Sequence, residues 1–430
     1  MNSSANPVFD VAVVGAGPAG IAAAVSASQS GARVALFDDN PRSGGQIWRG
    51  GPAAAHKGEA ADWFQRLGKS PVSIFHNARV FHLEPGALSA ESGDAVLQIS
   101  FRNLVLATGA RELFLPFPGW TLANVMGAGG VQALVKAGLP ITDKRVVVAG
   151  TGPLLLAVAA YLRHAGAKVV AVCEQVSWLR FLRFGMSISL LPGKLRQAAA
   201  MSLELAGIPF WANCWPVAAE GTDRLESVEL SHGGHIRRVE CDYLACGFHL
   251  IPNVELPRMA GCELHEGFVT VDEFQRTSAL NVFCAGEPTG IGGVELSLLE
   301  GQIAGYFATQ WEGAARNLFG KRATYRRAVA LLKRSFELRP ELKALAKPDT
   351  LVCRCEDVSL QRLAEHDSWR AAKLQTRCGM GPCQGRVCGA AARFLFDWEM
   401  DSARPPVFAV KCSSLAAVGA AAGEANGGTR

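Results

Sequence analysis

The chain has 430 residues, 49% of them hydrophobic, and its 43 basic and 38 acidic side chains give a formal net charge of +5. This length indicates two or three domains, and the high apolar content is typical of parallel sheets buried on both faces. So small a charge on so long a chain argues against nucleic-acid binding. The most apolar stretch, residues 146–162, is interrupted by glycines and a proline and is shorter than the roughly 20 residues of a spanning helix.

No basic region precedes the first apolar segment, so we expect no signal peptide and a cytoplasmic protein, with association at the cytoplasmic face of a membrane left open. Five of the twelve cysteines lie between residues 353 and 388. In that compartment, clustered cysteines indicate metal or redox use rather than a disulfide framework.

A strand, a glycine-rich turn, a helix and a second strand follow one another over residues 9–38. In such a turn Gly15 permits the bend, Gly17 lets the backbone approach a pyrophosphate, and Gly20 lets the helix pack close to the strand. Asp38 follows the second strand, where a carboxylate accepts ribose hydroxyls. The residues expected to hold the diphosphate and ribose are Gly15, Gly17, Pro18, Ala19, Gly20, Asp38 and Asp39.

Three later stretches are typical of a flavin domain. One is the Gly-Gly loop before Gln46, of the kind that runs beside a flavin ring. Another is a buried strand that ends in Ala107-Thr108-Gly109. The third is a strand that ends in Gly-Glu, which places a carboxylate on the ribityl chain, before a helix over residues 294–308. The expected contacts are Gly45, Gln46, Ala107, Thr108, Gly109, Gly286, Glu287 and Gly293.

A second nucleotide motif begins with the strand over residues 145–149. Gly150, Gly152 and the acidic Glu174 occupy the expected positions, but Leu155 stands where the third glycine belongs. A bulky residue there should hold the helix further from the strand and alter the diphosphate site. NAD or ATP in this domain, in a catalytic or a structural role, remains open. The apolar and basic stretch over residues 178–195 is expected to be a core helix, with a partner-facing surface as the alternative.

The order of these motifs resembles flavoproteins with two dinucleotide-binding domains, related to thioredoxin and glutathione reductases. Those enzymes carry a redox-active cysteine pair beside the flavin, and the Gly44-Gly45 region has none. Cys241 and Cys246 have a suitable spacing, but we expect them in one extended strand with thiols on opposite faces. Dithiol chemistry is therefore not expected.

The C-terminal cysteines fit four thiolate ligands to a [2Fe–2S] cluster. The expected set is Cys353, Cys355, Cys383 and Cys388, with Cys388 favoured because it opens a helix whose dipole stabilises a thiolate. Cys378 is the alternative fourth ligand and is interpreted as a bystander or an occasional substitute. Structural zinc and buried free thiols are the competing interpretations.

This module resembles the [2Fe–2S] domain of the type found in bacterioferritin-associated ferredoxin. Residues 8 to about 398 resemble the FAD- and iron–sulfur-containing α subunits of bacterial amine dehydrogenases, which include the A subunits of opine oxidases, the α subunit of D-hydroxyproline dehydrogenase and the B subunit of hydrogen cyanide synthase. The resemblance is carried by Gly44-Gly45-Gln46, Gly150–Leu156 and Gly379–Gly385. The resemblance implies an electron-transferring oxidoreductase subunit with FAD and the cluster, and no catalytic residue of its own. It also implies a β subunit of amino acid oxidase type that carries FAD and the substrate site, a small third subunit in some complexes, and an acceptor such as a quinone.

The expected architecture is α/β, with two Rossmann-like domains and a small [2Fe–2S] domain. The boundaries are residues 1–120 and 245–315 for the FAD domain and 121–244 for the second nucleotide domain. A basic linker over 316–348, the cluster domain over 349–412 and a disordered tail over 413–430 follow. A self-contained NAD(P)H-dependent reductase is the alternative function.

Overall fold

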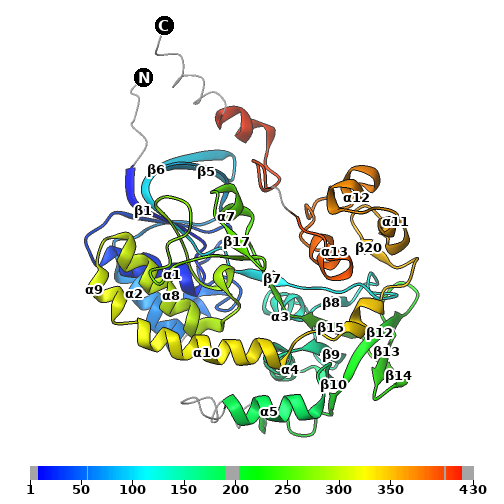
Figure 1. Cartoon of the computed structure of the whole chain (residues 1–430). Helices are drawn as coiled ribbons and strands as arrows, with labels where there is room; N and C mark the ends of the chain where they lie inside the picture. Colours follow the sequence, from blue (N-terminus) through cyan, green and yellow to red (C-terminus); the bar gives the residue numbers. More distant parts are fainter. Residues whose placement is uncertain (1–7, 56, 189–202, 401–402, 419–430) are drawn as a thin grey trace. The chain divides into compact units, whose positions relative to one another are not determined.

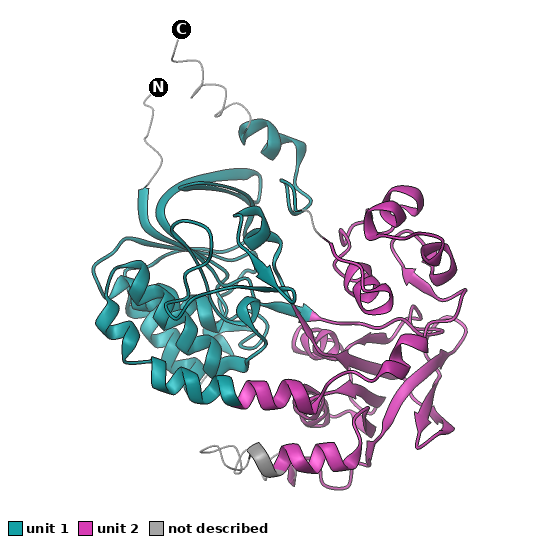
Figure 2. Ribbon diagram, viewed as in Figure 1, with its two compact units in different colours: residues 1–111, 252–327, 402–430 teal, residues 112–251, 328–401 magenta. Residues whose placement is uncertain are grey.

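The computed structural model describes residues 8–55, 57–188, 203–400 and 403–418. The chain forms two compact units (Figure 2). The first contains residues 1–111, 252–327 and 402–430, and the second contains residues 112–251 and 328–401. This division groups the cysteine module with the second nucleotide motif, and the finer domain boundaries given above remain predictions.

A seven-stranded sheet forms the centre of the first unit (Figure 1). Its order is β3 (Ser73–Phe75), β2 (Val34–Phe37), β1 (Val8–Val14), β6 (Ala95–Leu106), β5 (Ala87–Ser92) and β4 (Ala78–Glu84), with β19 (Val282–Cys284) also paired to β6. The pairs β1–β2, β2–β3, β1–β6 and β6–β19 are parallel, whereas β4, β5 and β6 form an antiparallel meander. The parallel strands therefore end at one edge of the sheet, where nucleotide-binding folds place their ligand.

Two helices of the first unit pack so closely that their backbones are in contact. A Cβ atom at Gly301 or Gly305 of α8 (Gly293–Ala308) would lie 2.1 or 2.2 Å from a carbonyl oxygen of α1 (Pro18–Ser28). The other elements are η1 (Gly51–Ala53), α2 (Glu59–Lys69), α7 (Glu255–Met259), β17 (Leu264–His265), β18 (Phe268–Val269), η2 (Glu287–Thr289) and α9 (Glu312–Arg316). The helix α10 (Phe319–Ser335), together with β7 (Ala110–Glu112) and β16 (Leu250–Pro252), carries the chain across the boundaries between the units.

A five-stranded parallel sheet forms the centre of the second unit. Its order is β11 (Phe210–Ala212), β10 (Lys168–Glu174), β9 (Arg145–Thr151), β15 (Tyr243–Phe248) and β8 (Val125–Gly127). Its helices are α3 (Ala128–Lys136), α4 (Pro153–His164) and α5 (Trp178–Ile188), and β12 (Cys214–Glu220), β13 (Ser227–His232) and β14 (His235–Glu240) form an antiparallel sheet.

The C-terminal part of the second unit is the cysteine module. It contains η3 (Pro340–Ala344), β20 (Leu351–Cys353), β21 (Val358–Ser359), α11 (Leu360–Ala364), α12 (Trp369–Thr376) and α13 (Cys388–Phe396). The indole Nε1 of Trp120 donates a hydrogen bond of 2.6 Å to the carbonyl oxygen of Leu351. Ala390 of α13 belongs to the same apolar core as the parallel sheet. The module therefore packs on the second nucleotide domain, and α13 begins at Cys388 as the sequence predicts.

Three local expectations need correction. The helix predicted in the core is only half buried, because Trp178 and Leu179 are 52% and 67% exposed while Phe184 is buried. Cys241 precedes β15 instead of lying in it, and its thiol lies in the same apolar core as that of Cys246, so strand alternation does not separate them. The predicted tail begins with a helical turn over residues 412–418, and residues 419–430 lie outside the described residues.

Candidate functional site

The first glycine loop joins β1 to α1 and is held by contacts that leave no room for side chains. Gly15 has a φ of +102°, and a Cβ atom there would lie 2.2 Å from the carbonyl oxygen of Ala107. A Cβ atom at Gly20 would lie 1.7 Å from the oxygen of Gly15. Gly17 differs, because the nearest atom to its Cβ position is a Gly45 carbon 3.9 Å away. The open space thus lies at the N-terminus of α1, where amide groups favour a phosphate.

The Gly44-Gly45 loop lies beside this space. The backbone N–H of Gly44 donates a hydrogen bond of 2.7 Å to the oxygen of Ala16. A Cβ atom at Gly45 would lie 3.0 Å from the Cα of Gly17. Gln46 is exposed, and its side chain accepts a hydrogen bond from Arg49. The two loops therefore meet through their backbone atoms.

Asp38 lies at the end of β2, next to the same loop. Its carboxylate accepts hydrogen bonds of 2.5 Å from the backbone N–H of Ala16 and 2.8 Å from that of Asn40. The side chain is 6% exposed. Asp39, expected beside it, is exposed at the surface. Of the two acids, Asp38 is the one fixed at the glycine loop.

The ends of three parallel strands meet next to the loop. The N–H of Ala107 donates to Val14, and the N–H of Ala285 donates to Leu106, at 2.9 and 3.0 Å. Thr108 exchanges two hydrogen bonds with Asn253, where the chain returns to this unit. The Ala107-Thr108-Gly109 and Gly286-Glu287 stretches are therefore brought together with the diphosphate loop, although they are far apart in sequence.

Glu287 carries the clearest sign that this site takes a ligand. One of its carboxylate oxygens accepts a hydrogen bond of 3.0 Å from the N–H of Gly293, whereas the other, Oε2, is buried and has no hydrogen-bond partner. Burial raises the pKa of Glu287 to about 7. A buried polar atom without a partner is costly, and a hydroxyl donor would satisfy it. The ribityl hydroxyls of FAD are such donors, so these residues fit the flavin.

The turn that carries Glu287 is held by a second acid that the sequence analysis did not single out. Glu300 of α8 is 2% exposed, and its Oε2 accepts hydrogen bonds from the N–H of Gly286 and the hydroxyl of Thr289 at 3.1 and 2.9 Å. Its Oε1 pairs with Arg326 of α10 at 2.9 Å. Gln275, fully buried, also accepts a hydrogen bond from Arg326. No local motif marks these residues, because their partners come from distant segments.

The second glycine loop repeats part of this arrangement in the second unit. Glu174 accepts hydrogen bonds of 2.7 Å from the N–H of Gly152 and from the hydroxyl of Thr151, matching the contact of Asp38 in the first loop. Burial raises the pKa of Glu174 to about 7. A Cβ atom at Gly150 would lie 1.9 Å from the oxygen of Gly247. Leu155 is buried in the core beneath the loop.

A feature of the second loop that the sequence did not reveal is its contact with residues 337–339. The side chain of Gln175 is fully buried and donates hydrogen bonds to Thr151 and to the carbonyl oxygen of Glu337, at 3.2 and 3.0 Å. It also accepts one from the N–H of Arg339. The segment before η3 therefore lies against the end of β10, which corresponds to the end of β2 that carries Asp38 in the first unit.

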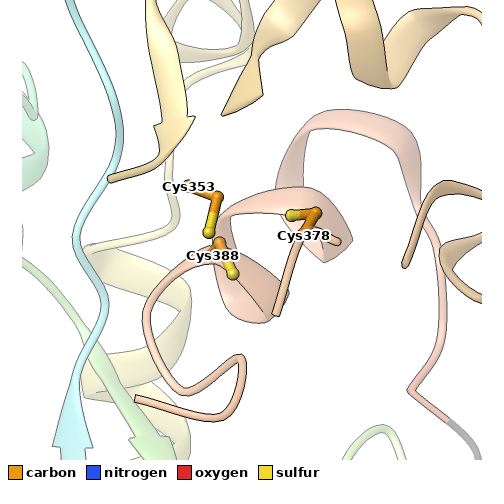
Figure 3. A group of neighbouring side chains, drawn as sticks. All are labelled: Cys353, Cys378 and Cys388. Carbon is orange, nitrogen blue, oxygen red and sulfur yellow. The ribbon is translucent and has the colours of Figure 1, made fainter. Parts of the chain in front are cut away.

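The cysteine module brings three thiols together. The sulfur atoms of Cys353, Cys378 and Cys388 all lie within 4.8 Å of one another, and the three residues are buried (Figure 3). Hydrogen bonds from the thiols of Cys378 and Cys388, and from the backbone N–H groups of Gly379 and Glu356, lower the pKa of Cys353 to about 2. A thiolate in such a donor set is the form that binds iron.

Cys355 and Cys383, two of the four expected ligands, form a second pair. Cys355 is exposed, Cys383 is half-buried, and the Cys355 sulfur accepts a hydrogen bond from the N–H of Cys383. A Cβ atom at Gly381 would lie 2.4 Å from that of Cys355, so the loop requires a glycine there. The thiol of Cys378, interpreted as a bystander, instead lies with those of Cys353 and Cys388. The module thus contains five cysteines, one more than the four thiolates that bind a [2Fe–2S] cluster. The choice of the four ligands remains a prediction.

Comparison with known proteins agrees with these features. The chain belongs to the pyridine nucleotide-disulphide oxidoreductase family, whose model matches residues 9–303. This family implies FAD as a cofactor.

The relatives extend over the cysteine module as well. The A subunit of opine oxidase from Rhizobium meliloti is 32% identical over 89% of this chain and 80% of that protein. The HcnB subunit of hydrogen cyanide synthase from Pseudomonas protegens is 30% identical over 90% of each chain. The chain is thus a member of the group that contains these flavoprotein oxidoreductase subunits. An L-proline dehydrogenase from P. horikoshii has the same fold, with a TM-score of 0.65 and 21% identity over 95% of this chain and 80% of its own. Among the described residues, no helix is both long and apolar enough to cross a bilayer.

Gly17→Val should give folded protein without flavin. The nearest atom to the Gly17 Cβ position is 3.9 Å away, so the branched side chain would enter the space intended for the diphosphate. The absorbance ratio of flavin to protein, with circular dichroism as the folding control, measures this. Full flavin content in this variant would contradict the assignment.

Glu300→Ala should weaken FAD binding about 5- to 150-fold, because leaving buried donors unpaired costs about 1–3 kcal/mol. The loss would free the Gly286 turn that carries Glu287. Titration of flavin-free protein with FAD gives the affinity. Glu312→Ala, which removes an exposed ion pair to Arg316 on the neighbouring helix, is the matched control and should leave the affinity unchanged.

The raised pKa of Glu287 predicts a pH dependence of stability in flavin-free protein. Between about pH 4.5 and 7 the folded protein retains a proton that the unfolded chain has released, so the free energy of unfolding falls as pH rises. The fall due to this group is at most roughly 3 kcal/mol and ends above pH 7. Glu287→Gln should remove it, whereas Glu84→Gln at an exposed position should not.

Denaturant titrations across this window, in the flavin-free Gly17→Val background, measure the slope. Glu174 in the second unit has a similarly raised pKa, so part of the slope should remain after Glu287→Gln. An unchanged slope would show that Glu287 ionises normally.

Proposed function

We propose that this chain is the electron-transferring subunit of a heteromeric dehydrogenase that oxidises an amine, such as an opine, D-hydroxyproline or a related imino or amino acid. A β subunit of amino acid oxidase type would hold a further FAD and the substrate. A small third subunit would complete some assemblies of this kind. Electrons would leave the complex to a quinone or another carrier at the cytoplasmic face of the membrane.

One observation carries this proposal above the others. A flavin cradle with an unpartnered buried carboxylate oxygen and a five-cysteine module occur in one chain. That chain is related, over about nine-tenths of its length, to proteins named as oxidase or synthase subunits. The residues present fit FAD and fit four thiolate ligands to a [2Fe–2S] cluster.

A bound FAD would accept electrons in pairs or singly, and a bound cluster singly. In the flavin site, the amide groups at the start of α1 would hold the pyrophosphate, Asp38 the ribose and Glu287 the ribityl hydroxyls. In the module, four of the five cysteines would provide thiolates. The chain has no cysteine before Cys173, so the Gly44-Gly45 side of the flavin offers no thiol for disulfide relay. This favours electron transfer over disulfide reduction.

A second candidate is a self-contained NAD(P)H-dependent flavin reductase that feeds the cluster. Its support is the contact of Glu174 with Gly152, which repeats that of Asp38 with Ala16. Leu155 at the third glycine position and the segment over the end of β10 count against it. In a third arrangement, NAD or ATP is bound structurally. Identification of nucleotide released on denaturation, together with flavin bleaching by NADH, distinguishes the three.

Expression alone and with a candidate β subunit tests the proposal. The complex should reduce an artificial dye in the presence of its amine, and the lone chain should not, because the substrate site lies on the partner. The complex that contains Gly17→Val should lose most of the dye reduction while the partner retains its own flavin. Amine turnover by the lone chain would refute the proposal, and NADH-driven turnover at a competent rate would replace it with the reductase.

A further inference from the structure

The cysteine module contains one thiol more than a [2Fe–2S] cluster requires, and that thiol is buried. Cys378 is fully buried, and its sulfur lies within 4.8 Å of those of Cys353 and Cys388 (Figure 3). Cys355, in contrast, is exposed at the surface. The best-shielded thiols of the module are therefore not the set that the sequence spacing favours.

The fold directs Cys378 inward by means of the turn that ends α12. Arg377 adopts a left-handed conformation with a φ of +65°, and the N–H of Cys378 donates a hydrogen bond of 3.2 Å to the hydroxyl of Thr376. The Arg377 guanidinium pairs with Glu356 at 2.8 Å. This ion pair joins the turn to the loop that carries Cys353 and Cys355, so the position of Cys378 is fixed relative to them.

Glycine next to Cys378 allows the turn to pack tightly against Trp369. Gly379 has a φ of +81°, and a Cβ atom there would lie 2.6 Å from the ring of Trp369. The N–H of Gly379 donates to the sulfur of Cys353. A thiol in a tight, glycine-lined turn beside two other thiols has the position of a ligand, unlike an ordinary core cysteine.

We propose that Cys378 is a reserve ligand, which takes the iron atom released by Cys355 when that exposed residue is lost by substitution or oxidised by a peroxide to the sulfenic acid. In the exchange, the iron–sulfur bond to Cys355 breaks and one to Cys378 forms. The proton of the Cys378 thiol passes to the departing thiolate, or to solvent when Cys355 is already oxidised. No electron is transferred in the exchange. An exposed thiol is the more readily oxidised one, so a buried substitute preserves the cluster.

This inference rests on the proposed iron–sulfur cluster, and single and double variants of the full chain test it. Alanine is used because a serine oxygen can itself bind iron. The variants are Cys355→Ala, Cys378→Ala and the double variant, with Cys412→Ala, an exposed cysteine outside the module, as the matched control. Iron and acid-labile sulfide per chain, and the electron paramagnetic resonance spectrum after reduction, report the cluster. Flavin content reports whether the first unit folds, and near-UV circular dichroism reports the packing of the aromatic side chains of the chain as a whole.

We expect Cys378→Ala and Cys412→Ala to match the wild type, with about two iron atoms per chain. Cys355→Ala should retain more than half of the iron with a shifted resonance spectrum, and the double variant should fall about tenfold. Loss of iron in Cys355→Ala alone, loss in Cys378→Ala alone, or retention in the double variant would each overturn the reserve role. Wild-type protein without iron, or with stoichiometric zinc, would overturn both this inference and the cluster of the proposed function.

Discussion

The flavin site depends on one constraint, the close approach of α1 to its neighbours through backbone atoms. Gly20 lies against Gly15 within the first loop, and Gly301 of α8 lies against Ala19 on the other side of the helix. A side chain at either glycine would push α1 away from the strand or from α8. Because the N-terminus of α1 must point at the diphosphate, and Gly286 approaches Ala19 as well, the binding geometry would shift with the helix.

Both nucleotide loops use a buried carboxylate, but the two sites differ in what surrounds it. In the first unit, Glu287, which lies near the loop of Asp38, has a buried oxygen without a hydrogen-bond partner, and this oxygen fits a hydroxyl donor of a ligand. In the second unit, Gln175 already bonds to residues 337–339 beside Glu174. The two domains therefore share a fold, yet the first has a buried carboxylate oxygen that can accept a hydrogen bond from a ligand, whereas the second has part of its loop engaged by its own chain.

The buried Glu300 pairs with the partly exposed Arg326 and so connects the turn at Gly286 to α10, the helix that continues into the second unit. A buried acid that accepts two hydrogen bonds from a turn and one ion pair from a helix would be costly to leave unpaired. Arg326 lies in the basic linker over residues 316–348, and its contact with Glu300 is a structural role that the composition of this linker did not suggest. The cysteine module shows the same principle, because Arg377 and Glu356 join two loops that carry thiols.

The sequence by itself determined the fold class and the order of the motifs, because glycine requirements and strand periodicity are local. It placed α13 at Cys388 and the acid at the end of β10 for the same reason. Only the tertiary structure decided which distant residues meet. Glu300, Gln175 and Arg339 have no local signature, since Glu300 accepts hydrogen bonds from residues at least 11 positions away, and Gln175 and Arg339 bond each other across 164 positions. Cys378 and Cys388 are equally spaced about Cys383, so spacing could not rank them, and the turn at Arg377 brought the thiol of Cys378 to those of Cys353 and Cys388.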